Sequence, residues 1–281
     1  MTKRILDFKH LDNFKEKMIC EEKSQATIEK YLRDIRTFML FINENPVTKE
    51  KVIAYKNKLR EDGYAIRSVN SMLAGINSYF SFLGWNELRV RTIKMQRKIY
   101  CSENKELSKT EYERLVNTAK RNNNERLAML LQTICGMGIR VSELKYVTVE
   151  TVKKGEAEVI CKGKVRSVFI MRKLQLKLSE YAKKHGIQSG SIFVTKNGNP
   201  MSRTNIWREM KSLCVMANVD PEKVFPHNLR HLFARVFYSI EKDIVKLADV
   251  LGHSSIDTTR IYIISTGTEH RRCIESMRLI I

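Results

Sequence analysis

The segment LGHSSIDTTRIYI (residues 251–263) joins a predicted helix end to two side chains suited to proton and phosphoryl chemistry. An apolar helical stretch stops at Gly252, His253 follows directly, and Tyr262 comes nine residues later. Histidine and tyrosine are both common residues. Their spacing therefore gains meaning only if the rest of the chain supplies groups that match them.

The composition favours a polyanionic partner. The chain has 281 residues, with 51 Lys and Arg against 31 Asp and Glu, which gives a net charge of +20. Such a field attracts nucleic acid, although a basic surface that only aids solubility is the alternative. The length and the 43% hydrophobic content suffice for two domains with separate cores.

Targeting signals and cysteine usage favour a soluble, cytoplasmic protein with no membrane partner. The opening MTKRILDFKHLDNFKEKM has no long apolar core, and the most apolar later stretch, LAMLLQTICGMGI (127–139), is interrupted by polar residues and glycines. Six cysteines are scattered along the chain without CxxC pairs. We therefore expect reduced thiols rather than disulfides.

The N-terminal third has the pattern of a helical bundle. Apolar residues recur at helical spacing over 28–42 and 69–83, and another amphipathic helix follows Thr48. The segment RVRTIKMQRKIYCSENKEL (89–107) is basic and lacks this period, which is typical of a linker. We predict a helical core-binding (SAM-like) domain over 1–98 and a second domain over 104–281.

The second domain is predicted to be helix-rich with a small antiparallel sheet. SKTE (108–111) has the form of a capping box, and helices are expected over 174–185, over 203–218 and from 227 onward. EAEVICKGKVRSVFIM (156–171) predicts two strands around a turn, and SIFVTKNGNPMS (191–202) predicts a further strand and turn. The fold class is mainly α, or α+β.

Arg140 in GMGIRVSEL (136–144) is the first candidate functional residue. It stands at the start of a helix, where free backbone N–H groups favour an anion, and it could clamp a phosphate. The alternative is an ion pair with Glu143, three residues along the same helix face.

PHNLRHLFA (226–234) supplies His227 and Arg230, three residues apart on one face of a helix that begins at a proline. His227 and His231 are four residues apart, a spacing also used by zinc ligands. The intervening arginine and the missing further ligands argue against a metal site, and we predict none.

CKGKVR (161–166) places Lys162 and Lys164 at a hairpin turn, where an ammonium group can reach a phosphate and donate a proton, although most turn lysines are simply solvated. Together with the other motifs this completes a set that phosphoryl transfer to a tyrosine requires. In that chemistry arginines take the place that Mg²⁺ has elsewhere. The set comprises Arg140, Lys162, His227, Arg230, His253 and Tyr262.

These segments, in this order, resemble the catalytic domain of the tyrosine recombinase (phage integrase) family. TIEKYLRDIRTFMLFI (27–42) is similar to the family's helical core-binding domain. The resemblance implies that Tyr262 is the nucleophile that forms a 3′-phosphotyrosine link with DNA. It also implies that the reaction is reversible and needs no cofactor, metal or ATP.

The resemblance also implies a role for each motif residue. Arg140 and Arg230 would clamp the scissile phosphate, with Glu143 supporting Arg140, and His227 would assist proton transfer at the tyrosine. His253 would hydrogen-bond the phosphate, and His231 would be a packing residue. Lys162 would protonate the leaving oxygen. Because Cys161 replaces the first glycine of the family's GKGxKxR turn and the turn is one residue shorter, Lys164 is the alternative.

The resemblance further implies that the chain works on a specific double-stranded DNA site as a homotetramer, through a Holliday-junction intermediate. A possible accessory DNA-bending or directionality factor belongs to the same expectation. The tail after Tyr262 would dock on a neighbouring subunit. We favour a mobile-element enzyme or a Xer-like one. A type IB topoisomerase is disfavoured by the integrase-like N-terminal domain, and an inactive DNA-binding regulator by the presence of every motif residue.

In the N-terminal domain, helix faces that carry Arg33 and Arg36 and, further on, Arg67 and Asn70 could enter the major groove of DNA. Arginine reads guanine and asparagine reads adenine in the major groove. Phosphate contacts and solvated charges are the alternatives.

Overall fold

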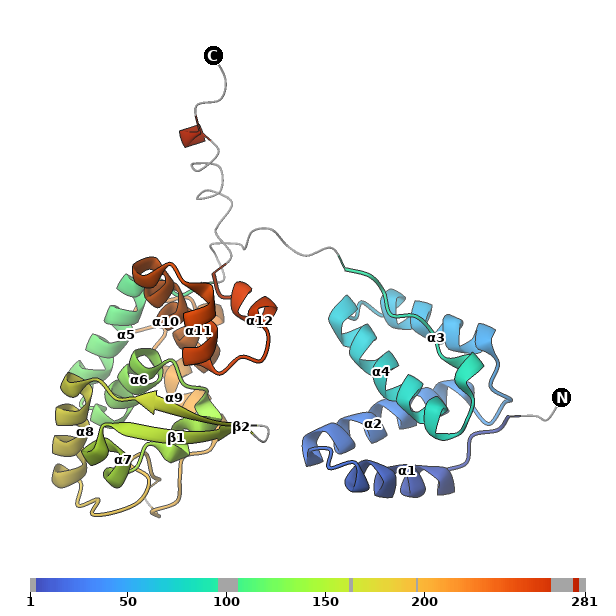
Figure 1. The fold of residues 1–281 in the computed structure, drawn as a ribbon, viewed down its shortest axis with the longest axis horizontal. Helices are drawn as coiled ribbons and strands as arrows, with labels where there is room; N and C mark the ends of the chain where they lie inside the picture. Colours follow the sequence, from blue (N-terminus) through green and yellow to red (C-terminus); the bar gives the residue numbers. More distant parts are fainter. Residues whose placement is uncertain (1–3, 96–105, 162–163, 196, 264–274, 278–281) are drawn as a thin grey trace. The chain divides into compact units, whose positions relative to one another are not determined.

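The structure, a computed structural model, describes residues 4–95, 106–161, 164–195, 197–263 and 275–277. The chain divides into two compact units, Met1–Arg97 and Lys98–Ile281. Helices dominate both units, and a two-stranded antiparallel sheet lies in the second (Figure 1). The predicted fold class is confirmed.

Four α-helices and a short 3-10 helix make up the described part of the first unit. They are α1 (Lys9–Cys20), α2 (Gln25–Ile42), α3 (Lys49–Glu61), α4 (Ile66–Phe82) and η1 (Asn86–Leu88). Side-chain caps begin two of them: Ser24 accepts from the Thr27 N–H and Thr48 from the Lys51 N–H. The predicted helices over 28–42, after Thr48 and over 69–83 correspond to α2, α3 and α4.

The core of the first unit is built on the contact between α2 and α4. Ile35 and Phe38 of α2 and Ile76 and Phe80 of α4 are all fully buried. Each helix thus turns its apolar face to the other, as the helical period of the sequence requires.

Two asparagines of α4 fix the segment that leaves this unit. Asn77 bonds both the N–H and the C=O of Val90, at 3.0 and 2.8 Å, and Asn70 does the same for Ile93, at 2.8 and 2.9 Å. A side-chain amide can replace a neighbouring strand in this way because it offers one donor and one acceptor side by side. The predicted linker thus begins as an anchored segment, and its residues 96–105 lie outside the described part of the chain.

The second unit begins with a capping box, as predicted. The Ser108 side chain accepts from the Glu111 N–H, and the Glu111 carboxylate accepts from the Ser108 N–H. Its described elements are α5 (Lys109–Arg121), α6 (Glu125–Met137), η3 (Val141–Tyr146), α7 (Val149–Lys154), β1 (Glu156–Cys161), β2 (Lys164–Phe169), α8 (Arg172–Lys184), α9 (Arg203–Ser212), η4 (Pro221–Lys223), α10 (Pro226–Glu241), α11 (Ile244–Leu251) and α12 (Ile256–Arg260).

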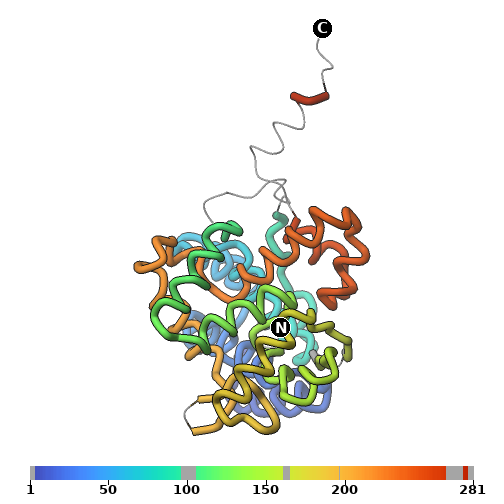
Figure 2. Tube along the Cα trace, turned by 90° about the vertical axis from the view of Figure 1, so that its left-hand side faces the viewer, coloured from blue at the N-terminus to red at the C-terminus, as the bar shows by residue number. Residues whose placement is uncertain are grey.

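Helix α6 is central to the second unit and contacts α5, α8 and α10. β1 pairs antiparallel with β2, with Glu156 opposite Phe169 and Cys161 opposite Lys164. Both views place α11 and α12, coloured orange to red, at the edge of this unit (Figures 1 and 2). Among the described helices none has the length and apolar character needed to cross a membrane.

Two element predictions in the second unit were wrong. The strand expected in 191–202 forms only isolated bridges in its described part, Thr148 with Ser191 and Val194 with Pro200, and Pro200 has no N–H with which to extend the second one. The turn expected after it is present, since the Thr195 N–H bonds the Asn199 carbonyl across it. The helix expected over 203–218 ends at Ser212, and the chain then passes through turns to Asn218, which has a positive φ of 48°.

Candidate active site

The end of α6 places the first arginine of the site. Gly138 ends the helix with a positive φ of 61°, and a Cβ there would lie 2.3 Å from Cδ1 of Phe233 on α10. Only glycine therefore allows the end of α6 to approach α10 this closely. Two residues later Arg140 caps η3, where the chain has turned toward the sheet.

A buried carboxylate organises the arginines. Glu143 is 1% exposed, and its two oxygens accept from the Arg140 N–H at 2.8 Å, from Arg140 Nη1 at 2.9 Å and from Arg166 Nη2 at 2.7 Å. The ion pair of Arg140 with Glu143, considered as an alternative to a functional role, is present as part of this network. The Arg140 side chain keeps 32% of its surface exposed, so it is also accessible to a ligand.

Arg230 is the most deeply buried cation of the site, at 1% exposure. It donates from Nη1 to the Gly138 carbonyl at 2.8 Å and from Nη2 to the Leu251 carbonyl at 2.6 Å. These bonds tie the end of α6 to the end of α11. Burial, followed by repulsion from Arg140, lowers the pKa of Arg230 to about 10, so it stays charged at neutral pH.

His253 is held in one tautomer. Its Nε2 lies 3.0 Å from Arg230 Nη2, which can only donate, so Nε2 accepts and Nδ1–H donates to Thr259 Oγ1 at 2.9 Å. Burial, followed by repulsion from Arg230 and Arg140, lowers the pKa of His253 to about 4. The imidazole is therefore neutral at physiological pH.

Tyr262 enters the same cluster from the turn after α12. Its N–H bonds the Thr259 carbonyl at 2.9 Å, its side chain is buried, and its hydroxyl lies 3.4 Å from Nε2 of His227 on α10. Burial, followed by repulsion from Arg230, Arg140 and Arg203, lowers the pKa of His227. A neutral imidazole therefore faces the phenol and is able to accept its proton.

Comparison with known proteins identifies the family. Residues 105–269 match the Phage integrase family, and residues 11–87 match its N-terminal SAM-like domain. The chain belongs to the phage integrase family. Tyrosine recombinase XerA of Pyrococcus furiosus is 30% identical over 100% of this chain and 98% of its own length.

Solved structures share the integrase fold. XerH site-specific recombinase bound to difH substrate has a TM-score of 0.69 at 17% identity, covering 96% of this chain and 84% of its own. A lambda integrase tetramer bound to a Holliday junction has a TM-score of 0.70 at 17% identity, covering 88% and 77%. At this identity the likeness concerns the fold alone.

The integrase fold brings Arg140, His227, Arg230, His253 and Tyr262 into one cluster, with Glu143 beneath it. Lys162 lies outside the described residues, and Lys164 is the first residue of β2, paired with Cys161. The choice between these two lysines therefore stays a prediction.

Sequence reasoning gave no role to Arg166, although its motif was noted. This β2 residue donates to Glu143 and, from Nη1, to the Val250 carbonyl at 2.6 Å. It therefore joins the sheet to the end of α11. The signal was present in the sequence as an arginine inside a motif already singled out.

The four candidate DNA-reading residues of the first unit differ in their surroundings. Arg33 and Arg36 on α2 and Arg67 on α4 are exposed, and Arg33 also lies 3.7 Å from Asp34. The Asn70 amide holds the backbone of Ile93 through both of its ends. Asn70 thus has a structural role in this unit that the sequence did not indicate.

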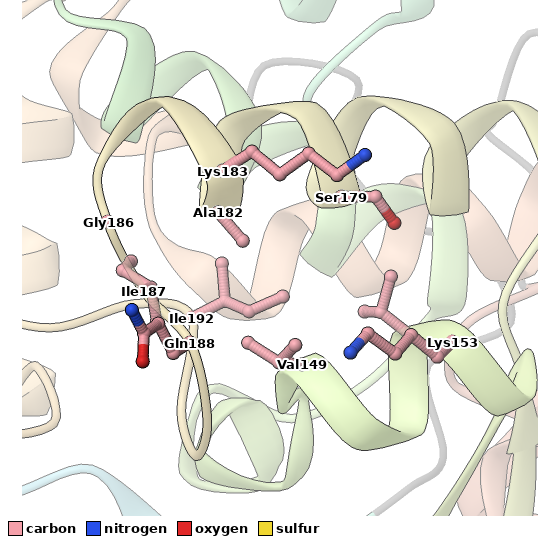
Figure 3. Close-up of a pocket in the computed structure, with 10 residues that line it drawn as sticks. Val149, Lys153, Ser179, Ala182, Lys183, Gly186, Ile187, Gln188 and Ile192 are labelled. Atoms are coloured by element: carbon pink, nitrogen blue, oxygen red, sulfur yellow. The ribbon is translucent and has the colours of Figure 1, made fainter.

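Two further features bear on ligands. Within the described ranges no group of three or more His, Cys, Asp or Glu side chains could hold a metal ion. A cavity of about 420 Å³ lies between α7 and α8 (Figure 3). Its lining includes the apolar side chains of Val149, Ala182 and Ile192 and the basic residues Lys153 and Lys183. It shares no residue with the candidate active site.

Proposed function

We propose that this chain is a site-specific recombinase that cuts and rejoins double-stranded DNA through a 3′-phosphotyrosine intermediate. One observation carries the proposal: the Tyr262 hydroxyl lies 3.4 Å from the neutral His227 imidazole, in a cluster that also contains Arg230 and Arg140. A nucleophile, a base and two cations for a phosphate are thus within one small volume.

In the proposed cleavage step the Tyr262 oxygen attacks the scissile phosphorus and gives its proton to His227 Nε2. The bond from phosphorus to the 5′ oxygen breaks, and that oxygen takes a proton from Lys162, with Lys164 as the alternative donor. Arg140 and Arg230 hold the non-bridging oxygens while negative charge builds on them. His253 can donate to the phosphate once Nε2 leaves Arg230 and carries the proton, with Nδ1 then accepting from the Thr259 hydroxyl, and Glu143 keeps Arg140 in place.

The new phosphotyrosine bond replaces one phosphate ester by another. Rejoining to a 5′-hydroxyl of a second duplex therefore requires no ATP, and the cations of the site provide the charge stabilisation that a metal provides in other phosphoryl transfers. The proposed reaction is thus reversible strand exchange without a cofactor.

Exchange between two duplexes requires four cleavages, so we propose a homotetramer on DNA with a Holliday-junction intermediate. The lambda integrase tetramer bound to a Holliday junction supports this assembly by likeness of fold, and XerH bound to difH substrate supports the DNA partner in the same way. An accessory bending or directionality factor and a mobile-element role are part of the same proposal. Sites bound in the cell by a Tyr262→Phe variant would test the role, since a mobile-element enzyme binds at element ends.

The test uses a nicked suicide duplex whose sequence is selected by binding to the Tyr262→Phe variant. Wild type is incubated with it in EDTA and the products are separated on a denaturing gel. We expect a covalent adduct with wild type and with Tyr238→Phe, a control tyrosine on α10, and none with Tyr262→Phe. An adduct that persists in Tyr262→Phe would refute the assignment, and binding by wild type without any adduct would favour the inactive regulator.

A further inference from the structure

The Tyr262 ring lies among three imidazoles. Its centroid is 4.1 Å from that of His231, 5.1 Å from that of His253 and 5.4 Å from that of His227. The proposed mechanism uses His227 and His253 and leaves His231 without a task. Yet His231 makes the shortest of the three ring contacts.

The geometry of that contact is a stack. The planes of His231 and Tyr262 are inclined by 28°, whereas His227 meets Tyr262 edge-on at 67°. His227 and His231 are four residues apart on α10 and so lie on one helix face. One face therefore presents a flat surface to the phenol ring and a nitrogen to its hydroxyl.

Tyr262 has few polar restraints among the described residues, although its ring is also buried in an apolar cluster with Ala234, Leu247 and Leu251. Its hydrogen bond to His227 is long, at 3.4 Å, and its backbone is anchored by one bond to Thr259 at the end of α12, a helix of five residues. Hydroxyl direction depends on ring direction, and a stacked partner adds a restraint on the tilt of the ring that is independent of this long hydrogen bond.

The His231 ring behaves as an apolar plane here. Burial, followed by repulsion from His227, lowers the pKa of His231 to about 4, so the ring is neutral at physiological pH. Its Nδ1 is buried and has no hydrogen-bond partner among the described residues. These surroundings favour the ring face, rather than either nitrogen, as the functional part of the side chain.

We propose that His231 is a positioning residue whose ring stacks on Tyr262 and directs the phenol hydroxyl toward His227 and the scissile phosphate. The positioning of the ring stands on geometry alone. The effect on cleavage rests on the proposed function. The two parts are therefore tested separately.

The first test needs no DNA. The protein is labelled with 3-fluorotyrosine, and the ¹⁹F line of Tyr262 is assigned as the one missing from Tyr262→Phe. His231→Phe should keep this line displaced by the ring current of its neighbour, and His231→Leu should move it. His185→Leu is the matched control, because the His185 ring, at the end of α8, lies tilted at 4.3 Å from that of Tyr181 and its loss should leave the Tyr262 line in place. An unmoved Tyr262 line in His231→Leu would overturn the proposal.

The second test measures single-turnover adduct formation on the suicide duplex. His231→Leu should lower the rate constant about two- to tenfold, the effect of losing one aromatic pair, while the dissociation constant for DNA stays unchanged. His231→Phe should restore the rate, and His185→Leu should leave it unchanged. Equal losses in His231→Phe and His231→Leu would assign the effect to a nitrogen and overturn the role of the ring. If wild type forms no adduct, the proposed function fails while the ¹⁹F result still decides the stack.

Discussion

Gly252 offers a direct test of how the site is assembled. It ends α11 with a positive φ of 64°, and a Cβ at this position would lie 2.3 Å from Cδ and 2.6 Å from Nε of Arg166. Gly252→Ala should therefore have two costs. Alanine must adopt a left-handed conformation, and Arg166 must leave its place against Glu143 and the Val250 carbonyl.

The two costs can be estimated separately. A left-handed conformation costs a residue with a Cβ roughly 1–2 kcal/mol. Hydrogen bonds to charged groups contribute about 1.5–3 kcal/mol, and Glu143 keeps its bonds from Arg140 when Arg166 moves. Counting one of the two Arg166 bonds as lost, Gly252→Ala should lower the free energy of unfolding of the second unit by about 2.5–5 kcal/mol, and losing both bonds would lower it further.

Gly186→Ala is the matched control. Gly186 also has a positive φ, 67°, but a Cβ there would meet nothing within 4 Å. It should have only the conformational cost of roughly 1–2 kcal/mol and leave cleavage unchanged. Gly252→Ala should also slow adduct formation, because Arg166 supports the carboxylate that holds Arg140.

The assay is urea denaturation followed by tryptophan fluorescence. The chain has two tryptophans, and in a Trp85→Phe background the remaining Trp207 on α9 reports on the second unit. If Gly252→Ala and Gly186→Ala lost the same free energy of unfolding and formed the adduct at the same rate, Arg166 would have accommodated the added methyl group without any loss of stability. That result would refute the close packing of β2 against α11.

Two further predictions concern the histidines. Thr259→Val removes the hydroxyl that holds His253 Nδ1 and so fixes the orientation of the imidazole; adduct formation should slow roughly tenfold, the order of one hydrogen bond, while Thr259→Ser retains the rate. Equal rates for the two variants would contradict this. The pKa values of His231 and His253, about 4 when folded against 6.5 ordinarily, mean that the unfolded chain binds more protons between pH 6.5 and pH 4. Stability should therefore fall as pH falls through that window and be level above it, and a constant urea midpoint across the window would contradict the burial of these rings.

Much of the fold was predictable because periodic apolar residues determine helix faces. The helices over 28–42 and 69–83 follow from that pattern alone, and the hairpin over 156–171 from two β-prone runs around a glycine turn. The segment 191–202 has the composition of a strand but meets its partners at single points. Composition reports the preference of a segment and gives no information on whether a partner strand lies alongside it.

The site was predictable as a set of residues and less so as a network. Motif residues could be found because their types and order are visible in the sequence. The position of Arg166 depends on β2 approaching α11, far away in the chain, and on the glycine that leaves room for it. The structural role of Asn70 likewise depends on a segment 23 residues away. Such contacts are set by tertiary structure, and no local pattern encodes them.

The two clamp arginines of the proposed mechanism are unequal in a way that the sequence conceals. Arg140 is 32% exposed and, within the part of the chain that the structure describes, pairs with Glu143, whereas Arg230 is 1% exposed and joins two helix ends and His253. Losing Arg230 would therefore disturb the fold as well as the charge.

Around Glu143 three guanidiniums face one carboxylate, which leaves an excess of positive charge in a partly buried place. An anionic group that entered this cluster would relieve that repulsion, so the same charges that strain the free site favour a phosphate in it.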